Sequence, residues 1–179
     1  IGFGGFFAVY SYIAPLVTDV AGSPEWAVPI VLGLMGLGMT AGNIVGGHLA
    51  DIDLRRTLLI GLATLALVLG LLGALSVWIV TLSILVFVVG FVSSVLSPTI
   101  QTRLMDVAGD NQSIAAALNH SPLNIGNSLG AFLGGVVIAA GWGYTAPSWT
   151  GALLAVAGLI IALVSYRVDA RRAVRASVG

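Results

Sequence analysis

Residues 58–75 read LLIGLATLALVLGLLGAL, and this stretch decides the fold. It contains no charged residue, and Thr64 is its only polar side chain. A helix that spans a bilayer needs about 20 mostly apolar residues, whereas a transmembrane strand alternates apolar and polar side chains. The run does not alternate, and neither does the one at 149–164. The sequence therefore predicts membrane-spanning helices rather than a β-barrel.

Six such stretches follow one another along the chain. Short segments rich in turn residues separate them, such as Gly22-Ser23-Pro24-Glu25 and Asp51-Ile52-Asp53, so neighbouring spans should run antiparallel. We predict an all-α membrane protein in which residues 1–166 form one bundle and 167–179 form a polar cytoplasmic tail. The predicted transmembrane helices are 3–21, 27–49, 56–75, 78–103, 113–139 and 148–166.

The composition excludes several classes of protein. Hydrophobic residues make up 58% of the chain and charged residues 8%, and the mean hydropathy is +1.07. Soluble domains carry about 25% charged residues, so a soluble enzyme, a disordered chain and a nucleic-acid binder are all excluded. There is no cysteine, and neither histidine has a second ligand at metal-binding spacing. We therefore expect no metal, no cofactor and no enzymatic activity.

The arginines indicate the orientation in the membrane. A six-span topology places all of them on one side, namely Arg55, Arg56, Arg103, Arg167, Arg171, Arg172 and Arg175. The opposite loops, near 22–27, 75–78 and 140–148, contain none. Positive residues mark cytoplasmic loops, so both termini are expected in the cytoplasm. Because the chain opens at Ile1 within an apolar run, we expect a fragment of a longer protein.

The sequence also contains an internal repeat. Asp19-Val20-Ala21-Gly22 recurs as Asp106-Val107-Ala108-Gly109, and the glycines of span two recur in span five with nearly the same offset. Chance is the alternative, because Gly, Ala and Val are abundant here. A real repeat would relate residues 1–77 to 78–166, and three spans per copy would turn the second copy upside down. Inverted repeats of three helices are common in secondary transporters, where they support alternating access.

Spans two and five each carry the pattern G-x-x-x-G-x-x-x-G. Small residues four apart lie on one face of a helix and let two backbones approach closely. We predict helix packing through these glycines, against a neighbouring helix or a moving partner half. They are Gly38, Gly42 and Gly46 in span two, and Gly126, Gly130 and Gly134 in span five.

Polar side chains concentrate in span five, with a few in spans one, two and four. An amide in hydrocarbon is costly unless it finds a partner. The residues could form hydrogen bonds between helices, or they could line an aqueous cavity, which we favour because so many cluster together. The cavity candidates are Tyr10, Tyr12, Asn43, Gln101, His120, Asn124 and Asn127. No acidic residue lies in mid-membrane, whereas a proton-driven pump needs a buried carboxylate, so if the chain belongs to such a pump we expect the proton site in a portion outside it.

The segment Gly47–Arg56 resembles the cytoplasmic loop signature of the major facilitator superfamily, roughly G-x-x-x-D-R/K-x-G-R-R/K. Gly47, Asp51, Arg55 and Arg56 match it, whereas Ile52 and Leu54 depart from it. Residues 115–135 and the opening Tyr-Ser-Tyr-Ile-Ala-Pro-Leu are similar to the eleventh and seventh helices of drug:proton antiporters, and above all to sugar and chloramphenicol efflux permeases. The resemblance implies that the chain is the C-terminal six-helix half of a twelve-helix transporter.

In that superfamily the loop acts as a conformational latch, and the resemblance assigns this role to Gly47, Asp51, Arg55 and Arg56. It implies proton-coupled efflux of a small amphipathic molecule, a drug or a sugar, across the bacterial inner membrane. The expected partners are membrane lipid, the substrate and the N-terminal half. Two alternatives remain, which are uptake of a neutral solute by the same fold and a self-sufficient six-span channel or scaffold that oligomerises.

Overall fold

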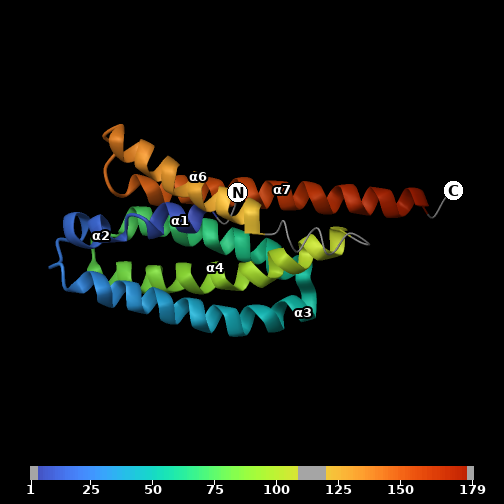
Figure 1. Cartoon of the computed structure of the whole chain (residues 1–179), viewed down its shortest axis with the longest axis horizontal. Coiled ribbons are helices and arrows are strands. Elements are labelled where there is room, and N and C mark those ends of the chain that lie inside the picture. Colours follow the sequence, from blue (N-terminus) through green and yellow to red (C-terminus); the bar gives the residue numbers. More distant parts are fainter. Residues whose placement is uncertain (1–3, 109–119, 177–179) are drawn as a thin grey trace.

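The computed structural model describes residues 4–108 and 120–176, and side chains within them except those of 106–108, 120, 122–123 and 170–176. The predicted all-α fold is confirmed, since no β-strand lies within these residues. Long helices run side by side along one axis (Figure 1). The elements are α1 (Gly4–Tyr10), α2 (Ile13–Pro15), η1 (Leu16–Val20), α3 (Ala27–Leu75), α4 (Ile79–Ala108), α6 (His120–Ala139) and α7 (Ala146–Ala176).

The first predicted span is not one continuous helix. It breaks after Tyr10, resumes as α2 at Ile13 and continues as the π-helical turn η1. Pro15 accounts for the break, because it has no N–H to donate to the carbonyl of Ser11. The segment ends in a glycine cap, in which Gly22 has φ +59° and the Ser23 N–H donates to the Val17 carbonyl at 3.0 Å.

Predicted spans two and three form the single helix α3, bent at one residue. Asp53 alone has non-helical dihedrals inside α3, with φ −154° and ψ 91°. The expected turn at Asp51-Ile52-Asp53 is therefore reduced to a kink, which divides α3 into a first limb, 27–52, and a second limb, 54–75. Among the described residues, α3, 79–105 of α4 and 146–169 of α7 are long and apolar enough to cross a membrane.

The two ends of the bundle differ in their arginine content. The turn after η1, the turn between α3 and α4, and the turn between α6 and α7 lie at the left end in Figure 1. The kink of α3 and the C-terminal ends of α4 and α7 lie at the right end. All seven arginines belong to the right-end segments. The polar residues 167–176, expected as a tail, continue the helix α7.

One face of the second limb of α3 is buried inside the bundle, and the other is exposed. Leu62, Leu65, Leu69 and Leu72 are buried there and join a core shared with α1, η1, the first limb, α4 and α7. Spans three and six are the most apolar and hold few polar residues, which predicts a lipid-facing position for both. That description fits α7, because only 17% of its most apolar 18-residue stretch is buried. It does not fit span three, whose continuous hydrophobicity supplies a core face as well as an exposed one.

Glycines set the closest contacts between helices. A Cβ on Gly38 would collide with the backbone carbonyl of Phe87 in α4, and one on Gly42 with that of Phe91. A Cβ on Gly46 would lie 2.6 Å from Val95 Cα. In the second half of the chain, Gly126 and Gly130 of α6 meet the backbone of Gly4 in α1. Span two thus packs on span four, and span five packs on span one. The two contacts are equivalent under the expected pairing of the repeats.

Candidate functional site

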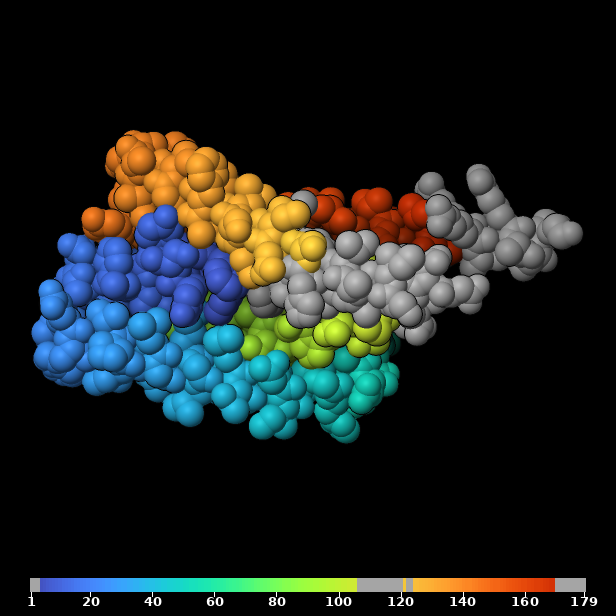
Figure 2. Space-filling view, viewed as in Figure 1, coloured from blue at the N-terminus to red at the C-terminus, as the bar shows by residue number. Residues whose placement is uncertain are grey.

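One face of the bundle is built by α1, the first limb of α3 and α6 (Figure 2). Three of the amide side chains expected to line a cavity are exposed, namely Asn43 on α3, Gln101 on α4 and Asn124 on α6. Asn127 is half-buried, and its Oδ1 has no hydrogen-bond partner among the described atoms. His120 begins α6, but its side chain lies outside the described part of the chain.

The two candidate tyrosines have different surroundings. The Tyr12 hydroxyl donates to the Ala131 carbonyl of α6 at 3.0 Å, and a Cβ on Gly134 would lie 2.7 Å from the Tyr12 ring. Tyr12 therefore joins the break after α1 to the glycine face of α6. Tyr10 is exposed and stacks on Phe6, with ring centroids 5.7 Å apart. Tyr10 is thus available to a molecule outside the bundle, whereas the Tyr12 hydroxyl is already engaged.

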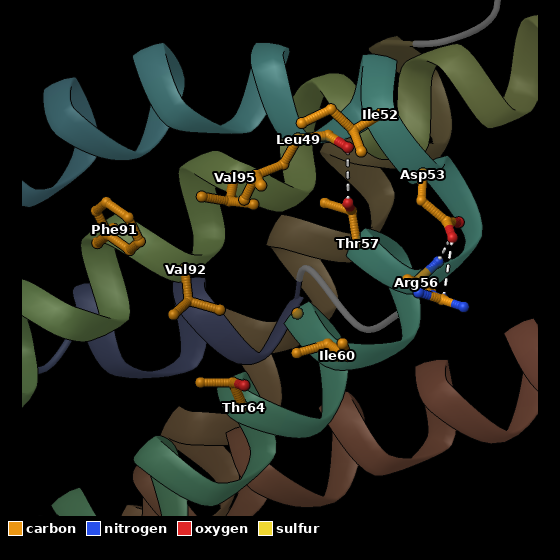
Figure 3. Close-up of a pocket in the computed structure, with 11 residues that line it drawn as sticks. Leu49, Ile52, Asp53, Arg56, Thr57, Ile60, Thr64, Phe91, Val92 and Val95 are labelled. Atoms are coloured by element: carbon orange, nitrogen blue, oxygen red, sulfur yellow. Dashed lines mark hydrogen bonds and ion pairs between the residues drawn. The ribbon is translucent and has the colours of Figure 1, made fainter.

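The kink of α3 is held by side-chain hydrogen bonds that cap its two limbs. Asp53 Oδ1 accepts from the backbone N–H of Arg56 at 3.0 Å, as an N-cap residue does. The Thr57 hydroxyl donates to the Leu49 carbonyl across the bend at 2.9 Å, and Arg56 Nε pairs with Asp53 Oδ2 at 3.1 Å (Figure 3). These interactions satisfy backbone groups that the bend releases, so the kink is a defined structure.

A second cluster joins three helices near the same end. The guanidinium of Arg103, on α4, lies 4.5 Å from the ring centroid of Tyr166, on α7, and that of Arg55 lies 5.3 Å from it. Arg103 also forms an ion pair with Asp169 and donates to Ser165 Oγ at 3.3 Å. Tyr166 therefore connects the kink of α3 to α4 and α7 through its ring.

The sequence model of the Major Facilitator Superfamily matches residues 1–178. The chain belongs to the major facilitator superfamily. It is 32% identical over 167 residues to the inner membrane transport protein YdhP of Escherichia coli K12, covering 93% of this chain and 43% of that protein. It is 31% identical over 156 residues to a chloramphenicol resistance protein of Streptomyces lividans, covering 87% and 40%. It thus spans about two fifths of the relatives it matches.

Membership of this superfamily, together with the apolar helices, identifies the chain as a multi-pass membrane protein of a transporter family rather than of an enzyme family. The expected relation to this superfamily is therefore confirmed. Of the four residues that match its loop signature, Gly47 is half-buried and Asp51 is exposed. The cap at the kink is made by Asp53, which the signature does not include. Arg55 contacts the ring of Tyr166, and Arg56 pairs with Asp53.

No motif in the sequence indicated that Tyr166, Ser165 and Asp169 belong to this charged cluster. Their spacing carries a signal, because Tyr166 and Asp169 lie three residues apart and therefore project from neighbouring positions of one helix. The partner, Arg103, lies at the end of a different helix. Only the packing of α4 beside α7 brings the residues together.

Proposed function

We propose that the chain is the C-terminal six-helix half of an inner-membrane efflux transporter that moves a small, neutral, amphipathic molecule by alternating access. A second six-helix half of the same protein would face the exposed polar side chains. The coupling ion would be the proton, bound in that other half. The names of the relatives, an inner membrane transport protein and a chloramphenicol resistance protein, support efflux of this class of compound.

The observation that carries the proposal is the exposure of the amide side chains of Asn43, on α3, and Asn124, on α6. Asn43 lies well inside the first limb of α3, far from either end. An amide at that depth is costly in contact with lipid, so an aqueous path or a partner half should cover it. Neutral amide and hydroxyl groups then suit a neutral substrate with a few polar groups.

Transport by the full-length protein in proteoliposomes tests the proposal. We expect chloramphenicol and similar neutral amphipathic compounds to move against their gradient when a proton gradient is imposed, and to equilibrate when it is collapsed. Movement of the compound in the same direction as the protons would favour uptake by the same fold. If the flux of the compound did not depend on the proton gradient and the compound did not accumulate, a channel would be favoured and the proposal overturned.

Asn124→Ala and Tyr12→Phe should separate a cavity residue from a packing residue. Asn124 is exposed in this half, so its loss should change the order of preference among several substrates and leave the melting temperature nearly unchanged. Tyr12→Phe removes one hydrogen bond to a backbone carbonyl, which should lower stability by about 1 kcal/mol and affect all substrates equally. Competition assays and thermal melts on proteins matched for expression measure both effects. Equal loss for every substrate in Asn124→Ala would return that residue to packing.

The topology can be tested with single cysteines in the full-length protein. We expect Pro24→Cys and Thr145→Cys, in the arginine-free turns, to react with a membrane-impermeant thiol reagent added outside the cell. Asp53→Cys and Arg172→Cys should react only after the membrane is opened. Reaction of Pro24→Cys only after the membrane is opened would contradict the orientation.

A further inference from the structure

A groove of about 370 Å³ lies between the two limbs of α3 and has α4 as its floor (Figure 3). The first limb contributes Leu49 and Ile52, the second contributes Ile60 and Thr64, and α4 contributes Val92 and Val95. At its charged end it also includes Asp53 and Arg56 of the kink. Most of its lining is therefore apolar, with one ion pair at one end.

The groove continues the exposed apolar surface of α3. Ile60 is 64% exposed and begins a stripe on the second limb that continues through Leu67 and Leu71 at helical spacing. On the other side, Leu49 and Ile52 belong to the exposed apolar surface of the first limb. The surrounding medium of such surfaces in a membrane protein is hydrocarbon. An apolar groove open to them is filled by whatever apolar chain the bilayer supplies.

The length of the groove corresponds to one leaflet. Thr64 lies eleven residues after Asp53 in the second limb, which is a rise of about 16 Å along a helix. The hydrocarbon core of a bilayer is about 30 Å thick, so one leaflet contributes about 15 Å. The kink, with its charges, would sit at the headgroup level, and Thr64 near the bilayer centre.

The charged end suits a phosphate. The side chain of Arg56 is 82% exposed although it pairs with Asp53, so its guanidinium has donors free to face a headgroup. Arginine binds phosphate oxygens with two parallel hydrogen bonds. The apolar lining and the exposed guanidinium thus lie where the acyl chain and the phosphate of one phospholipid would need them.

We propose that this groove binds one phospholipid of the arginine-side leaflet, with an acyl chain between the limbs of α3 and its phosphate on Arg56. Because the acyl chain would contact both limbs and α4, the lipid would brace the kink against α4. This proposal depends on the membrane-spanning helices and not on the transported substrate, so the two can fail separately.

Photocrosslinking in nanodiscs tests the proposal. The full-length protein is reconstituted with phosphatidylglycerol that carries a diazirine within one acyl chain, and labelled residues are mapped by mass spectrometry. We expect labelling of Thr64, Val92 and Val95 to exceed that of Ile160 and Ile161, which are exposed on α7 and report ordinary contact with lipid. Labelling of the groove no stronger than that of α7 would overturn the proposal.

Two variants with a matched control sharpen the result. Thr64→Phe should fill the groove and reduce its labelling to the level of α7, and Thr64→Leu serves if the larger side chain prevents folding. Leu67→Phe, on the exposed stripe of the same limb, should leave the labelling unchanged. Arg56→Gln should weaken labelling by the phospholipid but not by a diacylglycerol with the same diazirine chain. Persistence of groove labelling in both Thr64 variants would overturn the acyl-chain site, and equal effects of Arg56→Gln on both lipids would overturn the phosphate contact.

Discussion

Gly42→Ala is expected to destabilise the bundle by at least about 3 kcal/mol, the upper part of the range for overpacked cores. The added methyl group would overlap the backbone carbonyl of Phe91, and a backbone cannot move aside as the end of a flexible side chain can. For a chain of this size the melting temperature should fall by roughly 10 °C. Thermal melts in detergent, together with the yield of monodisperse protein, measure the effect.

Gly36→Ala is the matched control, and it should leave the stability of the bundle unchanged or raise it slightly. Gly36 lies on the same limb of α3, but a Cβ there would have no described heavy atom within 4 Å apart from the neighbouring backbone of its own helix. Alanine is a better helix former than glycine by about 1 kcal/mol, so this variant should be as stable as the wild type or slightly more so. Because Gly42 meets a carbonyl and not a side chain, Phe91→Ala should not rescue Gly42→Ala. Rescue would show that the contact is not the one described.

The long helices and most of the turns could be predicted from the sequence because they depend on local chemistry. A continuous apolar run of bilayer length has few alternatives to a membrane helix, and glycines such as Gly22 and Gly141 provide positive φ angles at the turns. The arginine distribution predicted which segments share one end of the bundle, and the structure places them there. The spacing of Gly38, Gly42 and Gly46 indicated a packing face, although not which helix would cover it.

What the sequence did not reveal depends on contacts between distant residues. The segment at 51–53 contains turn residues, yet the structure needs only Asp53 to leave the helix, because side chains of Asp53 and Thr57 satisfy the released backbone groups. The signature directed attention to Asp51, two residues away. For the candidate cavity, polarity indicated which residues would be unusual in lipid. It could not distinguish exposed Asn124 from Tyr12, whose hydroxyl bonds to a carbonyl 119 residues away.

Tyr166→Leu should weaken the arginine end of the bundle, whereas Tyr166→Phe should not. The ring of Tyr166 faces both Arg55 and Arg103, and each cation–π contact is worth about 0.5–2 kcal/mol depending on its exposure. Phenylalanine keeps a ring at the same position, but leucine does not. We therefore expect a loss of about 1–3 kcal/mol for Tyr166→Leu and a much smaller one for Tyr166→Phe. Thermal melts of both variants measure the difference.

The same substitution should also reduce transport, because the ring links the kink, where the superfamily signature lies, to α4 and α7. A difference of about 1.4 kcal/mol between two conformations changes their populations tenfold, so losing these contacts can trap the transporter in one state without unfolding it. A double-mutant cycle with Arg103→Gln assigns the effect: the cost of Tyr166→Leu should shrink when the guanidinium is already absent. Arg103 would still be paired with Asp169 in the single Tyr166 variant, so the charge of Arg103 stays compensated there. If Tyr166→Phe proved as damaging as Tyr166→Leu, the hydroxyl and not the ring would join the three helices. If Tyr166→Leu and Tyr166→Phe both transported normally but were less stable, the cluster would stabilise the bundle and have no part in the balance of its conformations.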